Sequence, residues 1–239
     1  MSGHSKWATI KRQKGANDAK RGALFTKLSK AVTIAVSAGG GVADPAQNFR
    51  LRLAVEAARG ANMPKDTIER AIEKAAGKSG IVLEEVLYEG FGPGGVGIIV
   101  EAATDNKNRT TSEVANAFNK NGGNMGAMGS VSYQFKKMGQ LLVDKGSLSF
   151  DQLFLEAADA GAEDVEESDT LAYVYTQPND LAKVRDSLSQ KGIGVKEMEL
   201  VWQPTMTVTV DDTTGEKIMN LLEKLEELDD VQKTYSNMA

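Results

Sequence analysis

The sequence predicts an α+β protein of three parts, in which a basic helical part precedes two parts that mix strands and helices. Three observations lead to this expectation. Apolar residues recur at helical spacing up to Gly80, the pattern after Gly80 alternates as a strand does, and strands and helices then follow in a repeated order. The 239 residues are enough for several small domains, each with its own core.

The N-terminal part begins with an arm and continues as a helix. Residues 1–17 show no sustained apolar period, so we expect an extended arm there. From Asp18, the spacing of Leu24, Leu28 and Ala31 predicts one apolar helical face, with lysines on the other side. Three consecutive glycines at 39–41 are costly inside a helix and indicate its end.

The remaining elements follow from apolar period and from the positions of Gly and Pro. Further helices are expected at 45–60, 64–77, 108–121, 150–160, 178–190 and 214–227. Strands are expected at 83–91, 95–103, 131–136, 140–143, 162–166, 171–177, 195–202, 205–210 and 231–235.

The order of these elements predicts two ferredoxin-like domains, one inserted into the other. Residues 138–203 follow the plan strand, helix, strand, strand, helix, strand, which is that of a ferredoxin-like fold. The flanking segments 95–136 and 205–235 each follow strand, helix, strand, so together they give the same plan again. We therefore expect a basic helical domain at 1–80, a ferredoxin-like domain at 81–137 plus 204–239, and an inserted one at 138–203.

Charge is distributed very unevenly along the chain. Residues 1–80 contain 15 Lys or Arg against six acids, a net charge of +9, whereas the remaining residues contain 13 against 27, a net charge of −14. A basic end of this kind attracts a polyanion, although isolated charge runs are more often only solvated surface. The candidate phosphate contacts are Lys6, Lys11, Arg12, Lys14, Lys20, Arg21, Lys27 and Lys30, with Arg50 and Arg52 as a second group.

Trp7 lies among these lysines. An exposed indole in a basic arm is suited to stacking on a nucleobase, and the alternative is that it packs back onto the helices.

The inserted unit has five basic against 13 acidic residues, so it is the least suited to binding phosphate.

The composition argues against several classes of protein. There is no cysteine and His4 is the only histidine, so neither a zinc site nor a histidine-based triad has enough members. We therefore expect no enzyme activity, no cofactor, no metal and no small-molecule substrate. No apolar run approaches the ~20 residues that span a bilayer, and the N-terminus lacks the apolar core of a secretory signal. A cytoplasmic location without membrane contact is expected.

Three loops carry motifs that could have either a binding role or a purely structural role. Gly90, Gly92 and Gly95 match a dinucleotide fingerprint, but a strand follows them instead of a helix, so a hairpin connection is the better interpretation. Arg109 lies at a helix start, where neighbouring Asn and Asp side chains explain capping and the arginine could also hold a phosphate.

The segment 121–130 is rich in glycine and uncharged. We expect a pliable strip that could approach a partner through Asn124, Met125 and Met128, or simply a long connection. With His4 and Arg109, these residues are the possible additional contacts.

Long collinear motifs resemble the YebC family, which also includes the mitochondrial translational activator of cytochrome c oxidase. They are Gly3-His4-Ser5-Lys6-Trp7-Ala8, Asp18-Ala19-Lys20-Arg21-Gly22, Phe25-Thr26-Lys27-Leu28, Arg50-Leu51-Arg52-Leu53-Ala54, Asn62-Met63-Pro64-Lys65-Asp66, Ile68-Glu69-Arg70-Ala71-Ile72, Tyr88-Glu89-Gly90-Phe91-Gly92-Pro93-Gly94-Gly95, Thr104-Asp105-Asn106-Lys107-Asn108-Arg109-Thr110 and Lys120-Asn121-Gly122-Gly123-Asn124. Residues 138–203 match by layout only. Where members commonly have His-Arg-Lys after the Trp, this chain has Lys11-Arg12-Gln13-Lys14, so no imidazole role carries over.

The resemblance implies three domains with a helical first one. Nothing in the sequence marks a transit peptide, so we expect a bacterial member of the family. The resemblance also implies either a DNA-binding transcriptional regulator or a ribosome-associated translation factor that relieves stalling at proline-rich stretches. Together with the basic arm, this favours a non-enzymatic nucleic-acid-binding regulator whose partner is DNA or ribosomal RNA. Phosphate contacts supply affinity without sequence choice, and no helix-turn-helix is recognisable. The alternative is a protein-interaction module that uses its acidic domains.

Replacing Trp7 with Ala is expected to weaken RNA binding by about 1–3 kcal/mol if the indole stacks on a base. The slope of log affinity against log salt should stay near its original value, because the indole carries no charge. Fluorescence anisotropy titrations at several salt concentrations measure both quantities. A large fall in the slope would show that Trp7 supports phosphate contacts instead.

Overall fold

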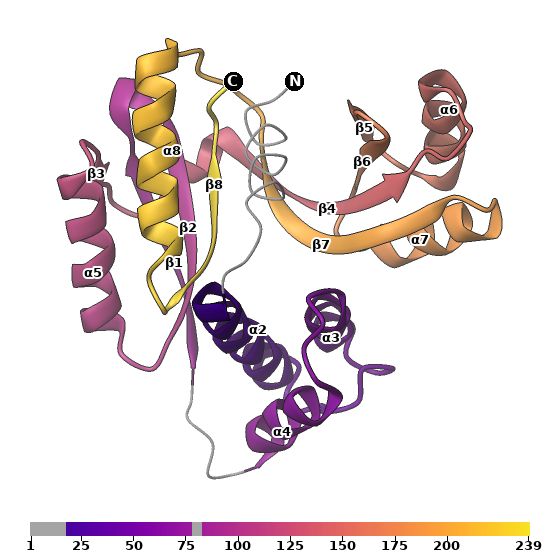
Figure 1. The fold of residues 1–239 in the computed structure, drawn as a ribbon, viewed down its shortest axis with the longest axis horizontal. Coiled ribbons are helices and arrows are strands. Elements are labelled where there is room, and N and C mark those ends of the chain that lie inside the picture. The colour runs from indigo at the N-terminus through magenta and orange to yellow at the C-terminus, as the bar shows by residue number, and fades with distance from the viewer. Residues whose placement is uncertain (1–17, 78–82) are drawn as a thin grey trace. The chain divides into compact units, whose positions relative to one another are not determined.

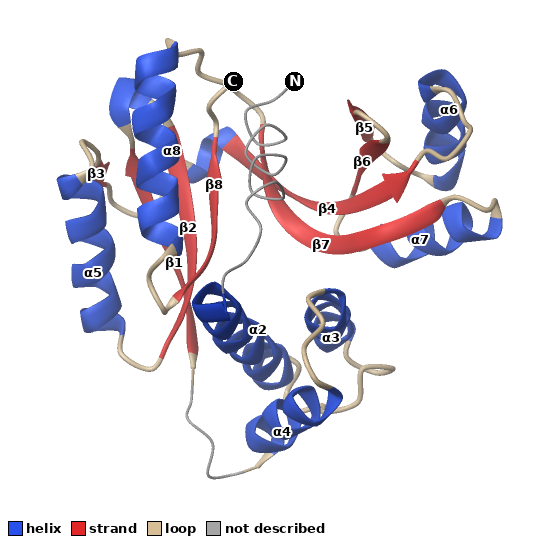
Figure 2. Ribbon diagram, viewed as in Figure 1, coloured by secondary structure: helices blue, strands red, loops and turns tan. Residues whose placement is uncertain are grey.

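The computed structural model describes residues 18–77 and 83–239, with side chains from residue 21 onward. It is a mixed α and β structure with two four-stranded antiparallel sheets (Figure 2). Residues 136–203 form one compact unit, and the rest of the described chain forms the other. A further division at residue 80 stays a prediction.

Within residues 18–77, the described chain forms three helices (Figure 1): α2 (Asp18–Ala38), α3 (Phe49–Gly60) and α4 (Lys65–Ala76). Their apolar faces meet in a core that buries Val32, Leu51 and Ile68, among others. Because the residues on these faces recur at helical spacing, burying them stabilises all three helices at once.

Helix α3 begins at Phe49 and not near Pro45, because Asn48 is its N-cap. The Asn48 carboxamide accepts from the Leu51 amide at 3.1 Å and donates to the carbonyls of Ala35 at 2.8 Å and Val42 at 3.0 Å. This buried side chain therefore satisfies one free N–H of α3 and joins the helix to the end of α2.

The sheet of the same unit has the order β3-β1-β2-β8. Its strands are β1 (Glu84–Phe91), β2 (Gly97–Thr104), β3 (Asn124–Met125) and β8 (Val231–Ser236). The helices α5 (Lys107–Lys120) and α8 (Asp212–Glu226) pack on it, and their Phe118 and Leu222 enter a core with Val100. β1 pairs with β2 from Glu84 opposite Thr104 to Phe91 opposite Gly97, and the short helix Pro93–Gly95 makes the turn between them.

Two expected strands of this unit differ in the structure. Residues 205–210 make only one isolated bridge, between Val208 and Met238, although Val208 and Val210 do pack on the core as their alternation predicts. Residues 132–134 form a short 3-10 helix, and β4 begins at Phe135. The alternation identifies the core-facing side chains only in part: Val131 and Phe135 are buried, but Tyr133 between them is 69% exposed. Likewise, Met206 alternates with Val208 and Val210 but is 62% exposed.

The second unit contains β4 (Phe135–Asp144), α6 (Phe150–Ala160), β5 (Asp164–Ser168), β6 (Leu171–Thr176), α7 (Leu181–Gln190) and β7 (Gly194–Pro204). Its sheet order is β5-β6-β4-β7, so the first and last strands of this unit are neighbours. Leu141, Val174 and Leu188 are fully buried within it. Helix α6 has a capping box, in which Ser149 and Gln152 bond each other's backbone amides. Within the described ranges, no helix is long and apolar enough to cross a membrane.

Candidate nucleic-acid interface

Two of the candidate phosphate contacts on α2 meet the C-terminal end of α8. The Lys27 ammonium donates to the Glu226 carbonyl, and the Lys30 ammonium donates to the Asp229 carbonyl at 2.9 Å. The last turn of a helix has carbonyls without intrahelical partners and carries the negative end of the helix dipole. Lys27 therefore satisfies an acceptor that the last turn of α8 leaves free, and Lys30 bonds a carbonyl of the connection that follows α8.

The carboxylate of Asp230 connects α2, α5 and the end of β2. Asp230 is only 3% exposed, and its oxygens accept from Lys30 Nζ at 2.6 Å, Arg109 at 2.7 Å, Thr110 Oγ1 at 2.7 Å and Thr104 Oγ1 at 3.1 Å. Burial raises the pKa of Asp230, but the hydrogen bonds from Lys30, Thr110 and Arg109 outweigh it and hold the pKa well below its usual range. This carboxylate is charged and fully paired.

Arg109 is paired with carboxylates of its own chain. Besides Asp230, its guanidinium donates to Asp105 at 2.9 Å, and the hydrogen bonds to Asp230 and Asp105 raise the pKa of Arg109 above its ordinary value. Asn106 caps α5 by accepting from the Arg109 amide at 3.1 Å. The capping interpretation of this segment is thus observed directly, and the Arg109 side chain, 46% exposed, turns to acids instead of standing free.

Other cations predicted on the helices also have partners within the chain. Arg50 forms an ion pair with Glu85, and Arg52 donates to the carbonyls of Pro45 at 3.0 Å and Ala46 at 3.1 Å. Arg21 is exposed and lies over the ring of Phe25, 5.8 Å from its centroid. Lys20 is within α2, but its side chain lies outside the description, as do His4, Lys6, Trp7, Lys11, Arg12 and Lys14.

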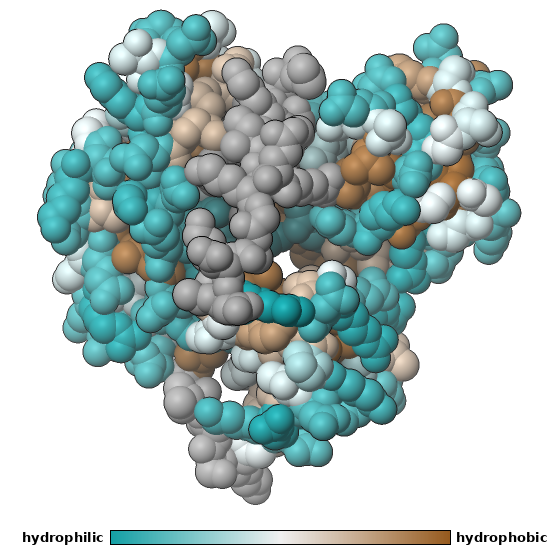
Figure 3. Space-filling model, viewed as in Figure 1, coloured by the Kyte–Doolittle hydropathy of each residue, from teal (hydrophilic) through white to brown (hydrophobic). Residues whose placement is uncertain are grey.

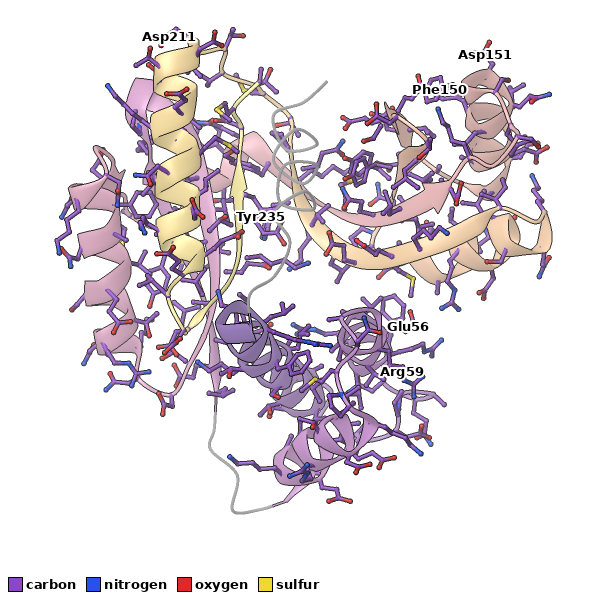
Figure 4. The ribbon with its side chains drawn as sticks, viewed as in Figure 1. Glu56, Arg59, Phe150, Asp151, Asp211 and Tyr235 are labelled. Atoms are coloured by element: carbon purple, nitrogen blue, oxygen red, sulfur yellow. The ribbon has the colours of Figure 1, made fainter. Side chains whose placement is uncertain are left out.

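Further exposed cations on the helices were missed by the sequence reasoning. Arg59 lies on α3, where Figure 4 labels it with Glu56, and Arg70 and Lys74 lie one turn apart on α4. Among the described residues, Arg59 and Lys74 have no hydrogen-bonded or ionic partner. Arg70 and Lys74 could have been found from the sequence, because their i, i+4 spacing places both on the polar face of an amphipathic helix.

A cleft of about 850 Å³ lies between α2 and α4 on one side and α5 and residues 227–230 on the other. The helical wall carries hydroxyls and cations: Thr26, Ser29, Lys30, Thr33, Thr67, Arg70 and Lys74. Among the described residues, the opposite wall carries one cation, Arg109, and five acids: Asp105, Glu113, Glu227, Asp229 and Asp230. The cleft therefore separates a basic from an acidic surface.

The glycine-rich loop is held in place by a buried carboxylate. Glu89 in β1 is 2% exposed and accepts from the amides of Gly129 at 2.8 Å, Val131 at 2.7 Å and Ser132 at 2.9 Å. Burial raises the pKa of Glu89, but the hydrogen bonds from the amides of Gly129, Val131 and Ser132 lower it by more. The net shift of the pKa is therefore downward. These bonds tie the end of the loop, from Gly129 to Ser132, to the buried strand β1.

The anchored loop presents two large side chains to solvent. Met128 is 83% exposed and Tyr133 is 69% exposed, whereas Asn124 and Met125 form β3 and pair with Phe91 and Gly90. The Tyr133 ring and the Glu89 anchor were not among the predicted contacts. An acid between the apolar positions of a strand, as Glu89 is, was the available signal for a buried polar group.

The chain is similar to known proteins over nearly its whole length. Residues 5–78 match the family model described as TACO1/YebC protein N-terminal domain, and residues 83–238 match the model described as TACO1/YebC second and third domain. A protein of Trichlorobacter lovleyi is 50% identical over 238 residues, which cover 99% of this chain and 95% of the relative. A protein of Treponema denticola is 52% identical over 239 residues, which cover 100% of this chain and 96% of that relative. Both are named "Probable transcriptional regulatory protein".

A solved structure is also similar. The crystal structure of a conserved hypothetical protein from Aquifex aeolicus matches with a TM-score of 0.85 and 45% sequence identity, covering 93% of this chain and 91% of that one. Among the side chains that the structure describes, no group of three or more His, Cys, Asp or Glu could hold a metal ion.

Replacing Glu89 with Gln should loosen the loop, because an amide offers one acceptor where the carboxylate offers two and brings an NH₂ group against backbone donors. The same loosening should appear in the unchanged protein at low pH. Since the folded-state pKa of Glu89 is lowered, its contribution to stability is present above the ordinary Glu pKa and is lost as the pH falls through the folded value.

Hydrogen exchange of the Gly129, Val131 and Ser132 amides measures this. We expect at least about tenfold faster exchange, after correction for intrinsic rates, in Glu89→Gln and no change in the exposed control Glu69→Gln. Equal protection in Glu89→Gln and the original protein would contradict the anchoring role.

Proposed function

Because the chain belongs to the TACO1/YebC family, we propose that it is a nucleic-acid-binding regulator of gene expression that performs no catalysis. The observation that carries this proposal is the net charge of +9 on residues 1–80 in a chain whose total is −5. Part of this charge lies on the described helices, where Arg21, Arg59, Arg70 and Lys74 are exposed. The name that the relatives carry, "Probable transcriptional regulatory protein", supports the same general role.

The finer proposal is that the partner is ribosomal RNA and that the protein acts in translation, where it relieves stalling at proline-rich stretches. Two features favour RNA over duplex DNA. Trp7 in the arm and Tyr133 on the anchored loop are suited to stacking on unpaired bases, which RNA loops offer and a closed duplex does not. Arm lysines then supply the affinity through phosphates. Regulation of transcription through DNA is the alternative within the same proposal.

Reversing the charge of Lys11, Arg12 and Lys14 to Glu should abolish nucleic-acid association at near-physiological salt. Each lost phosphate contact lowers the slope of log affinity against log salt by about 0.7 to 0.9, so the triple variant should lose at least roughly 2 from that slope. The matched control reverses Lys145, Lys183 and Lys196, which lie in the acidic unit 136–203. Binding that survives the arm reversal at matched salt would refute the proposal.

Ribosomes and DNA can be ranked by competition for the same protein. With the protein bound to labelled duplex DNA at near-physiological salt, we expect purified ribosomes to displace it at a far lower concentration than unlabelled DNA does. The reason is that the DNA complex is held only by general attraction to phosphates, whereas the ribosome complex also has contacts that are specific to RNA. Stronger competition by a particular DNA sequence would make transcription the function.

A protein partner is the second candidate function, and one observation favours it. Helix α6 exposes Phe154 and Leu155, the latter 65% exposed, in the unit with 13 acids against five basic residues in 138–203. Hydrophobic residues reach the visible surface of this unit in Figure 3. Figure 4 places Phe150 and Asp151 at the start of the same helix.

A photo-crosslinking residue in place of Leu155 tests this second function. If the acidic unit binds a protein, crosslinking in cells should yield one defined adduct, and Leu155→Ser should remove its partner without changing nucleic-acid affinity. The same probe at the exposed Lys183 of α7 is the control. Absence of a defined adduct at position 155 would exclude α6 as the docking surface.

A further inference from the structure

We propose that the surface formed by α2 and α4 binds a polyanion in competition with the acidic end of α8, so that binding separates the two walls of the cleft. This inference rests on the proposed function, because the polyanion is taken to be nucleic acid. We define the α8 end as residues 226–230, and the basic surface as Lys27, Lys30, Arg70 and Lys74.

The contacts of Lys27 and Lys30 show why the two partners exclude each other. Lys27 donates to the Glu226 carbonyl, and Lys30 divides its hydrogen bonds between the Asp229 carbonyl and the Asp230 carboxylate. An ammonium group has three donors and approaches a phosphate through the same hydrogens. The Lys30 side chain is only 20% exposed while the contact is made, so a phosphate reaches it only after the α8 end moves away.

The α8 end can lose Lys30 without leaving a buried charge unpaired. Asp230 keeps Arg109, Thr104 and Thr110 as donors, and all three are held by β2 and α5 next to it. Breaking a buried ion pair is strongly unfavourable when it leaves one charge alone. Here the remaining donors avoid that penalty, which makes the contact between α2 and the α8 end reversible.

The released surface is suited to a phosphate backbone and not to a neutral ligand. Arg70 and Lys74 line the cleft beside Lys30, and the hydroxyls of Thr26, Ser29 and Thr33 lie on the same wall. Across the cleft, Glu227, which also pairs with Lys224 at 2.7 Å, and Asp229 place negative charge on the wall opposite these cations. A polyanion offers the cations negative charge, as the acids on the opposite wall do, but at a higher density.

Two measurements on the full-length protein test this inference, with a single-stranded RNA of mixed sequence as the probe. The chain has no cysteine, so Ala57→Cys on α3 and Asn119→Cys on α5, both exposed, provide a unique pair of label sites. We expect the distance between spin labels at these sites to increase when RNA is added. A distance distribution that stays the same at saturating RNA would overturn the inference.

The second measurement is the RNA affinity after the acidic wall is neutralised. Glu227→Gln combined with Asp229→Asn should raise the affinity about threefold to tenfold, because the competitor for the cations is weakened while their charge is kept. The control combines Glu84→Gln with Glu216→Gln, which makes the same change in net charge at exposed sites that do not line the cleft. An equal gain in the control would show a general charge effect and overturn the inference.

The outcomes separate this inference from the proposed function. If the arm reversal abolishes RNA binding but the label distance never changes, the regulator function stands and competition at the α8 end is wrong. If the unchanged protein does not bind RNA or DNA at all, both proposals fail.

Discussion

The buried carboxylate of Asp230 is the interaction on which the arrangement of the larger unit depends. A charge that is 3% exposed must be paired, and Asp230 obtains four donors from three places in the chain: Lys30, Thr104, and the pair Arg109 and Thr110. In obtaining them it fixes the end of β2 against the start of α5 and brings α2 to the end of α8. The basic helices are thereby joined to the sheet by a polar contact between a lysine and a buried carboxylate.

This constraint divides the cations of the basic region into two groups. Lys27, Lys30, Arg50 and Arg52 bond acceptors of the chain itself, which holds the helices and their loops in place. Arg59, Arg70 and Lys74 are exposed and extend the positive surface along α3 and α4. Sequence position alone does not separate these groups, because a lysine that pairs with a distant carboxylate and one that faces solvent look identical along the chain.

Local pattern predicted much of the fold and little of the site. Helical period and flanking Gly or Pro located α2, α4 and α5 to within a few residues. Capping by the Asn and Asp residues near the start of α5 was also predicted, and Asn106 is the residue that makes the cap. The bond between Lys30 and Asp230 joins residues 200 positions apart, and Asp229-Asp230 in sequence looks like a solvated turn. Glu89 was overlooked for the same reason, since its partners at 129, 131 and 132 are set by folding and not by spacing.

The most direct test of the central claim is to map where nucleic acid contacts the protein in the cell. Ultraviolet crosslinking followed by mass spectrometry of the crosslinked peptides identifies the contacting residues. We expect crosslinks within residues 1–80, at Trp7 and the neighbouring lysines above all, with residues 121–134 as a second position. Crosslinks concentrated in the acidic unit 136–203, or none anywhere in residues 1–80, would contradict it.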